Sequence, residues 1–215
     1  MHKKVILIIG AGERLGRAIA SRFSTEGFDL LLISRNASKL DELKTQLSNG
    51  INKIEVYPTD ITDNEDFTHQ LEIIRSRYKK IDVMLYNVAS INKGNAFKIC
   101  ENDILYDFQV NVLGLLTAVR YLKNCIPKST GTILVTGGSI AIHPKPDYAS
   151  LSITSAGLLS MVRCLSFTLR DCGIYVATIL INGKIDENCK LRNPQNIADQ
   201  FSKLNKERHI TEVLL

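Results

Sequence analysis

The sequence has little of three features that define other protein classes: paired cysteines, long hydrophobic runs and low-complexity linkers. Its five cysteines are odd in number and form no C-x-x-C pair, which predicts reduced thiols in a cytoplasmic protein and no metal site. The apolar run near the N-terminus covers only residues 5–9 and leads into glycines. We therefore expect neither a signal peptide nor a membrane partner. No linker or repeat divides the 215 residues, and we expect one domain.

Basic residues are not concentrated in any part of the sequence. The formal net charge is +5, and it is spread along the chain apart from small groups such as Lys79-Lys80. A nucleic-acid-binding surface needs basic residues clustered on one face or in one segment. We interpret the charge as solvated surface and expect no nucleic-acid partner.

Residues 5–20 contain the main glycine motif. An apolar run ends at Gly10, Gly12 and Gly16, and apolar residues then resume with helical spacing. Because glycine lets a backbone approach a ligand closely and the start of a helix attracts anions, this stretch suits a diphosphate. Leu15 occupies the last glycine position of the common G-x-G-x-x-G motif. An ordinary strand-to-helix turn is the alternative interpretation.

Apolar segments typical of strands alternate with helical segments along the whole chain. Strands are expected at residues 5–9, 28–33, 53–57, 81–86, 131–136, 174–181 and 210–214, and helices at 14–26, 38–47, 62–78, 103–125, 148–171 and 193–204. Runs of Val, Ile and Leu separated by helices predict an α/β fold, a doubly wound parallel sheet with helices on both faces. Thr62-x-x-Glu65 predicts a capping box at the third helix.

In a doubly wound sheet, ligands lie beyond the carboxyl ends of the strands. Besides the glycine loop, the residues expected at those ends are Arg35, Asp60, Asn87, Ser139 and Gly183.

Segments in order along the chain resemble motifs of the short-chain dehydrogenase/reductase family. Gly10 to Gly16 is similar to the family's T-G-x-x-x-G-x-G loop, with Arg14 replacing the middle glycine, and Asp60-Ile61 is similar to its adenine contact. Residues 86–89 are similar to its N-N-A-G motif, and Asn111 matches its active-site asparagine. Residues 131–139 are similar to the strand that carries its catalytic serine, and Asn182-Gly183 stands in place of its usual Pro-Gly.

This resemblance implies a single Rossmann-type, NAD(P)-binding domain over residues 1–215. It also implies a dinucleotide partner and a small carbonyl or alcohol compound as substrate. The cofactor-binding residues that it implies are Gly10, Gly12, Arg14, Leu15, Gly16, Arg35, Asp60, Ile61, Asn87 and Gly183.

The residue after the second expected strand indicates which dinucleotide binds. A carboxylate there would bond a ribose 2′-hydroxyl, whereas a guanidinium favours a 2′-phosphate. The sequence has Arg35, which, together with Arg14, predicts NADP(H) in preference to NAD(H); a plain surface arginine is the alternative. Glu13 would repel a phosphate unless it turns outward or pairs with Arg14 or Arg17.

The catalytic pair of the family is missing from the sequence. Its members use a tyrosine as general acid with a lysine four residues later, and none of the seven tyrosines here is followed by lysine at that spacing. Alignment by resemblance places Leu151 at the tyrosine and Ser155 at the lysine. The serine position falls on Gly138 or Ser139. Leucine has no proton to give, so we expect impaired or atypical catalysis.

The remaining candidates for catalysis are Asn111, Ser139 and Tyr148. Tyr148 lies one helical turn before Leu151 and could serve as a different acid, or it could be a packed residue at a helix start. His143, Lys145 and Lys184 lie in loops that border the same edge of the sheet, where a surface role is the simpler interpretation.

The C-terminal region, residues 184–215, is short. Relatives use it as a substrate lid, and here residues 184–193 are brief and polar, which predicts an open site. By resemblance, the two long helices form the interface of a homodimer or homotetramer. Three functions stay open: an NADP(H)-binding protein with impaired catalysis, a working NADPH-dependent oxidoreductase with a different acid, and a non-enzymatic interaction protein that keeps the fold.

Overall fold

Seven parallel strands form one sheet in the computed structural model, which describes residues 3–48 and 50–215. The strand order is β3-β2-β1-β4-β5-β6-β7. This confirms the predicted doubly wound α/β fold, and the order reverses between β1 and β4, the position where ligands bind in such sheets. The strands are β1 (Val5–Ile9), β2 (Asp29–Ser34), β3 (Ile54–Pro58), β4 (Val83–Tyr86), β5 (Thr132–Gly138), β6 (Tyr175–Ile181) and β7 (Glu212–Leu214).

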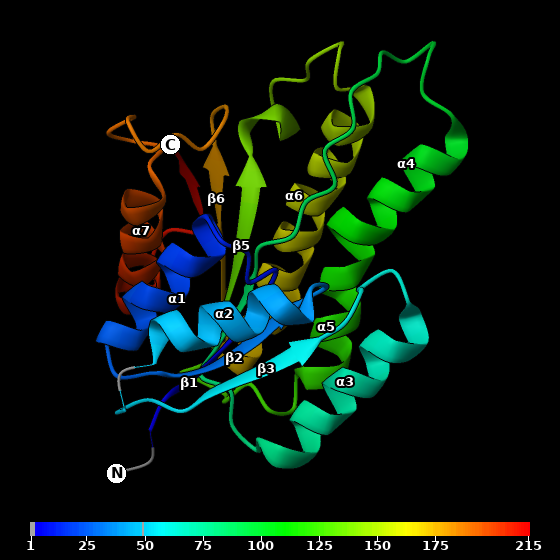
Figure 1. Cartoon of the computed structure of the whole chain (residues 1–215). Helices are drawn as coiled ribbons and strands as arrows, with labels where there is room; N and C mark the ends of the chain where they lie inside the picture. The colour runs from blue at the N-terminus through cyan, green and yellow to red at the C-terminus, as the bar shows by residue number, and fades with distance from the viewer. Residues whose placement is uncertain (1–2, 49) are drawn as a thin grey trace.

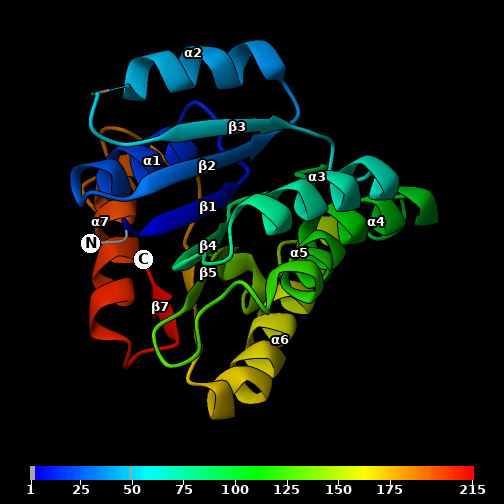
Figure 2. The ribbon, with the colours of Figure 1, turned by 90° about the horizontal axis from the view of Figure 1, so that it is seen from below.

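Helices cover both faces of the sheet (Figures 1 and 2). One face packs against α1 (Leu15–Thr25), α2 (Ala37–Leu47) and α7 (Pro194–Glu207), and the other against α3 (Asn64–Arg77), α4 (Glu101–Phe108), α5 (Gly114–Leu122) and α6 (Ala149–Leu169). Side chains alternate along a strand, so Ile6 and Ile8 of β1 enter one apolar cluster and Leu7 and Ile9 the other. This double burial explains the uninterrupted apolar run.

The long helix expected at residues 103–125 is divided by a π-helical turn, Gln109–Leu113, between α4 and α5. The Tyr86 hydroxyl donates to the Val110 carbonyl at 2.5 Å, which draws that carbonyl toward the sheet. A Cβ at Gly114 would lie 2.3 Å from the Tyr86 hydroxyl, so glycine allows this approach. Such turns occur at functional sites, and this one contains Asn111.

Asparagine and aspartate caps set the starts of three helices. Asn36 accepts from the Lys39 amide at 3.0 Å, and Asn193 accepts from the Asn196 amide at 2.7 Å. The predicted capping box at residues 62–65 is wrong, because Asp63 caps α3 instead. The Thr62 hydroxyl donates to Asp60 Oδ1 at 2.8 Å and so is directed away from the helix.

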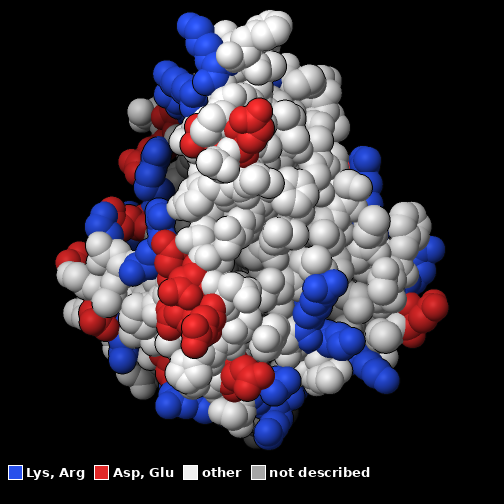
Figure 3. All heavy atoms as spheres, turned by 90° about the vertical axis from the view of Figure 1, so that its right-hand side faces the viewer, with Lys and Arg blue, Asp and Glu red and all other residues white. Residues whose placement is uncertain are grey.

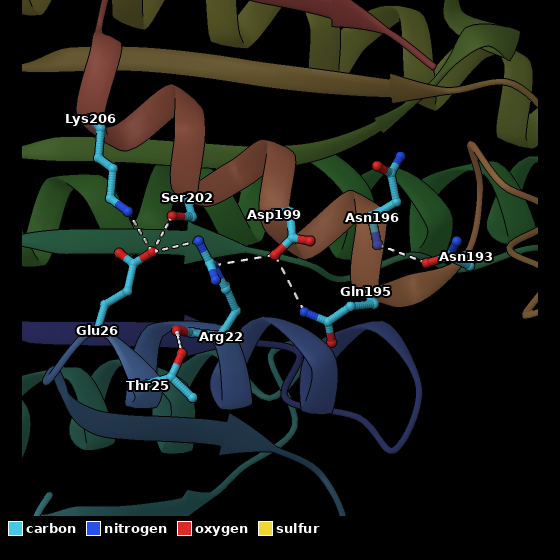
Figure 4. Close-up of polar contacts among 9 residues, drawn as sticks. All are labelled: Arg22, Thr25, Glu26, Asn193, Gln195, Asn196, Asp199, Ser202 and Lys206. Carbon is cyan, nitrogen blue, oxygen red and sulfur yellow. Dashed lines mark hydrogen bonds and ion pairs between the residues drawn. The ribbon is translucent and has the colours of Figure 1, made fainter.

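A polar cluster joins α7 to the end of α1 (Figure 4). Glu26 Oε1 accepts from Lys206 Nζ at 2.7 Å and from the Ser202 hydroxyl, and it lies 3.2 Å from Arg22 Nη2. Arg22 Nε lies 3.2 Å from Asp199 Oδ1. Burial raises the pKa of Glu26, but these hydrogen bonds and charges outweigh it, and the net pKa is lowered. The cluster holds α7 in position below residues 184–193.

One helical stretch, Ala149–Cys172, is long and apolar enough to cross a membrane by length and composition, and 33% of its most apolar 18 residues are buried. Leu158, Val162 and Leu165 of this stretch pack in the core beneath the sheet. Its apolar character is that of a helix that covers a sheet face.

Candidate functional site

A cleft of about 220 Å³ lies at the carboxyl ends of the strands on either side of the switch point. Its walls come from the loop after β1, the end of β2, the β3–α3 connection and the loop after β4. The predicted cofactor residues that line it are Gly10, Gly12, Arg35, Asp60, Ile61 and Asn87. The structure thus brings together residues that are up to 77 positions apart in the chain.

Backbone packing explains two glycines of the loop. Gly10 has φ +90°, and a Cβ there would lie 2.2 Å from the Asn87 carbonyl oxygen. A Cβ at Gly16 would lie 2.8 Å from the Gly10 carbonyl oxygen. A Cβ at Gly12 would have no atom within 4 Å, so this position is open toward the cleft. The arrangement fits a diphosphate laid against the loop and the start of α1.

Asn87 fixes the glycine loop from the neighbouring strand. Its Nδ2 donates to the Gly10 carbonyl at 2.9 Å, and its Oδ1 accepts from the Thr136 hydroxyl at 2.9 Å. The Asn87 amide also donates to the Ile9 carbonyl at 2.7 Å. These bonds lock the loop at the ends of β1, β4 and β5.

Arg35 and Asp60 face each other across the outer part of the cleft. Arg35 Nη1 lies 3.9 Å from Asp60 Oδ2, and the Arg35 side chain is 70% exposed. Asp60 Oδ1 is held by the amide and hydroxyl of Thr62 at 2.9 and 2.8 Å. Because the ion pair is long and exposed, it contributes little energy, and the guanidinium is able to turn toward an anion.

Glu13 adopts one of the arrangements expected for it, whereas Arg14 does not line the cleft with Arg35. Glu13 turns outward and pairs with Lys39 at 2.9 Å, and not with Arg14 or Arg17. Arg14 Nη2 donates to the Ile185 carbonyl at 2.8 Å, so it joins the glycine loop to the segment after β6. Arg14 borders a second hollow beside α1 and α2 and is absent from the lining of the cleft.

Leu15 and Gly16 begin α1 and are buried, so they lie behind the loop. Gly183 has φ +103° directly after β6, a conformation that favours glycine. None of these three lines the cleft.

Asn111 is buried, and both the oxygen and the nitrogen of its side-chain amide are hydrogen-bonded. Its Oδ1 accepts from the Ser90 amide at 2.7 Å, and its Nδ2 donates to the Ser90 carbonyl at 3.2 Å and to the Thr154 hydroxyl at 2.8 Å. It therefore connects the π turn, the loop after β4 and α6.

Ser139 and Tyr148 lie on either side of a loop at the same edge of the sheet. Ser139, at the end of β5, is buried and donates to Asn182 Oδ1 at 3.0 Å. Tyr148 precedes α6, is half-buried, and pairs with Gly94 through its backbone. Within residues 3–48 and 50–215, no hydrogen bond joins any two of Asn111, Ser139 and Tyr148.

Sequence reasoning missed several polar groups near this edge. Asp107 is fully buried and accepts from the Ser150 hydroxyl at 2.5 Å and from Asn92 Nδ2 at 2.8 Å. Hydroxyl residues within an otherwise apolar helix, at 150, 152, 154 and 155, were the available signal. Tyr106 lines the cleft from α4.

Comparison with known proteins identifies the family. The family model described as short chain dehydrogenase matches residues 4–186, and the chain belongs to the short-chain dehydrogenase/reductase family. Members of this family are oxidoreductases that use NAD(P) cofactors. The relatives include the uncharacterized oxidoreductase YvaG of Bacillus subtilis, 27% identical over 87% of this chain and 70% of its own length. An oxidoreductase of Staphylococcus aureus (strain N315) is 26% identical over 91% and 88% of the two chains.

Solved structures show the same fold. An alcohol dehydrogenase from Thermococcus sibiricus, complexed with 5-hydroxy-NADP, has a TM-score of 0.90 at 19% identity and covers 100% of this chain and 96% of its own. A short-chain dehydrogenase from Streptomyces avermitilis has a TM-score of 0.90 at 20% identity over 100% and 88% of the two chains.

Proposed function

We propose that this protein binds NADP(H) and has lost the ordinary proton-transfer catalysis of its family. The observation that carries the proposal is the position of Arg35, an exposed guanidinium at the end of β2 that lines the dinucleotide cleft. Asp60 also lines the cleft, and its ion pair with Arg35 is long enough to open for a phosphate.

We assign the cofactor from the charged residues of the cleft and from the glycines that let a ligand approach the backbone closely. Gly10, Gly12 and Gly16 let the loop receive the diphosphate, with Leu15 packed behind it. Asp60 and Ile61 face the adenine, Asn87 supports the loop, and Arg35 receives the 2′-phosphate. Arg14 and Gly183 border the diphosphate and nicotinamide sides. The 5-hydroxy-NADP in the Thermococcus sibiricus structure supports an NADP-type cofactor by analogy.

The proposed loss of catalysis rests on two positions of α6. Leu151 stands where the family has its general acid, and Ser155 stands where it has the lysine that lowers the pKa of that acid. A leucine side chain has no proton to donate. Asn111 uses its whole side chain to hold Ser90 and Thr154, which leaves a structural role for it.

Substitution of Arg35 tests the cofactor assignment. Arg35→Ala should weaken NADPH binding by about ten- to a hundredfold, as for loss of a charge-assisted phosphate contact, and leave NADH binding within about twofold. Arg75→Ala is the matched control, since Arg75 is an exposed α3 residue paired with Glu72. Equal losses for both nucleotides would overturn the assignment.

A second candidate function is a working NADPH-dependent reductase with Tyr148 as the acid. Tyr148 is half-buried at the start of α6, and its hydroxyl has no hydrogen-bond partner within the described part of the chain. A phenol free to meet a ligand favours this candidate. A non-enzymatic interaction protein is the third candidate, and failure to bind either nucleotide would support it.

We infer the oligomeric state from the apolar surface and the cellular location from the cysteines. Figure 3 shows a broad uncharged area over α4, α5 and α6, which includes the exposed side chains Leu105, Leu113, Ile153 and Phe167. An apolar area of this kind marks an interaction site, and we assign it to a homodimer or one half of a homotetramer. The five cysteines are unpaired, which supports a cytoplasmic location for this NAD(P)-binding domain of residues 1–215, with residues 184–215 as a short lid.

A further inference from the structure

Ser139 and Asn182 form a polar pair at the carboxyl ends of β5 and β6. These strands are in register up to the pair Gly138 and Ile181, so the residues that follow each strand lie side by side at one edge (Figure 1). The Ser139 hydroxyl donates to Asn182 Oδ1 at 3.0 Å. A serine hydroxyl has a single proton, and here that proton is used within the protein.

The backbone of Asn182 is held on both sides. Its amide donates to the Leu215 carbonyl at 2.7 Å, and its carbonyl accepts from Arg192 Nη1 at 2.9 Å. A proline at this position could not donate to Leu215. Asparagine therefore gains a backbone bond as well as a polar side chain, and Ser139 fixes the rotation of its amide group.

The Asn182 amide nitrogen is the group of the pair that remains without a partner in the described residues. Asn182 is exposed, and no group in the described residues accepts from its Nδ2. Both of its N–H donors are thus available to a ligand. Because Oδ1 accepts from Ser139, the side-chain group that remains for a ligand is a donor.

The ligand group that reaches this edge follows from the direction of the dinucleotide. In the proposed NADP(H) complex, Arg35 and Asp60 would hold the adenosine end beyond β2 and β3, and the glycine loop would hold the diphosphate at the end of β1. The far end then lies over β4, β5 and β6. That end is a nicotinamide ring, and its carboxamide carries a carbonyl oxygen that accepts hydrogen bonds.

We propose that Asn182 Nδ2 donates a hydrogen bond to the carboxamide oxygen of the nicotinamide, and that Ser139 is a positioning residue for Asn182. This proposal rests on the proposed NADP(H) binding. It assigns to Ser139 a role through Asn182 and not through a proton given to a substrate.

Calorimetric titration with two ligands tests the proposal. NADPH carries the nicotinamide, and adenosine 2′,5′-bisphosphate carries only the adenosine and 2′-phosphate end. Asn182→Ala should weaken NADPH binding by about three- to tenfold, the effect of one hydrogen bond, and leave bisphosphate binding unchanged. Ser139→Ala should weaken NADPH binding by a smaller factor, again with bisphosphate binding unchanged. Ser139→Thr keeps the hydroxyl and should restore NADPH binding.

Two controls separate this contact from a general loss of structure. Asn188→Ala removes an exposed asparagine from the same segment and should change neither affinity. Thionicotinamide NADPH replaces the carbonyl oxygen with sulfur, a weaker acceptor, and should bind the wild type and Asn182→Ala alike.

The outcomes are distinct. Equal weakening of both ligands, or an Asn182→Ala variant that binds NADPH as the wild type does, would overturn the role of Asn182 and leave NADP(H) binding in place. Wild-type protein that binds neither ligand would overturn the proposed function, and the inference with it.

Discussion

Asn111 Nδ2 donates to the Thr154 hydroxyl at 2.8 Å and so joins the π turn to α6. The Thr154 hydroxyl in turn donates to the Ser150 carbonyl at 3.0 Å. Both side chains are buried. From this contact we infer a structural role for Asn111 at the edge of the site.

Removal of Asn111 should therefore affect stability more than binding. Asn111→Ala leaves the Ser90 amide and carbonyl without their partner, and we expect a loss of about 2–3 kcal/mol in the free energy of unfolding. Urea denaturation measures this loss. Thr154→Val removes one of the three Asn111 bonds together with the Thr154 bond to the Ser150 carbonyl, and it should cost about 1 kcal/mol. An Asn111→Ala variant of unchanged stability that no longer binds NADPH would contradict a structural role.

The fold could be predicted from the sequence because its strands are buried on both faces. An uninterrupted apolar strand such as Val5–Ile9 is stable only inside a sheet covered by helices on both sides. Asn36 and Asn193 cap their helices through amides only three residues away, so these helix starts depend on local sequence. The cleft followed from the rule that carboxyl ends of parallel strands meet at one edge.

The site's finer geometry depended on partners distant in the sequence. The π turn arises because the Tyr86 hydroxyl bonds the Val110 carbonyl, and no local pattern in residues 103–125 contains that bond. The pairing of Ser139 with Asn182 required the register of β5 and β6. Thr62 lost its predicted capping role because Asp60 holds its hydroxyl.

Arg14 should control the mobility of the segment after β6. Its bond to the Ile185 carbonyl ties residues 184–193 to the glycine loop, so Arg14→Ala should raise hydrogen exchange in those residues. Exchange followed by mass spectrometry measures this, with Arg17→Ala as the neighbouring control. Equal exchange in wild type and Arg14→Ala would show that the bond does not restrain the segment.

Glu26 should contribute stability that depends on pH. Its pKa is lowered in the folded protein, so its stabilisation is present above the unfolded pKa and lost as the pH falls through the folded value. Glu26→Gln should lower the free energy of unfolding by about 1 kcal/mol near neutral pH. The difference in this free energy between the variant and the wild type should shrink below about pH 4.5. Urea denaturation across pH tests this. Glu72 lies in an exposed pair with Arg75, so Glu72→Gln should have almost the same free energy of unfolding as the wild type at any pH.

The uncharged area of α4 to α6 should hold two copies together. Ile153 is 50% exposed there, and Ile153→Glu should place a charge in the interface and give monomers in light scattering. Ile51→Glu, at a position 72% exposed on another part of the surface, should leave the mass unchanged. A wild-type protein that is monomeric at high concentration would contradict the assembly.

Tyr148 decides between the two enzymatic interpretations. If a preparation reduces a carbonyl compound with NADPH, Tyr148→Phe should abolish turnover only where Tyr148 is the acid. The proposed loss of catalysis predicts no NADPH oxidation by the wild type against a panel of aldehydes and ketones. Steady turnover that Tyr148→Phe reduces by about a hundredfold or more would establish the second candidate.

The most direct measurement of the central claim is a calorimetric titration of the wild-type protein with NADPH and, separately, with NADH. The account predicts micromolar affinity for NADPH, about −8 kcal/mol, and binding of NADH at least about tenfold weaker, because only NADPH offers a phosphate to Arg35. Equal affinity for the two nucleotides, or binding of neither, would contradict it.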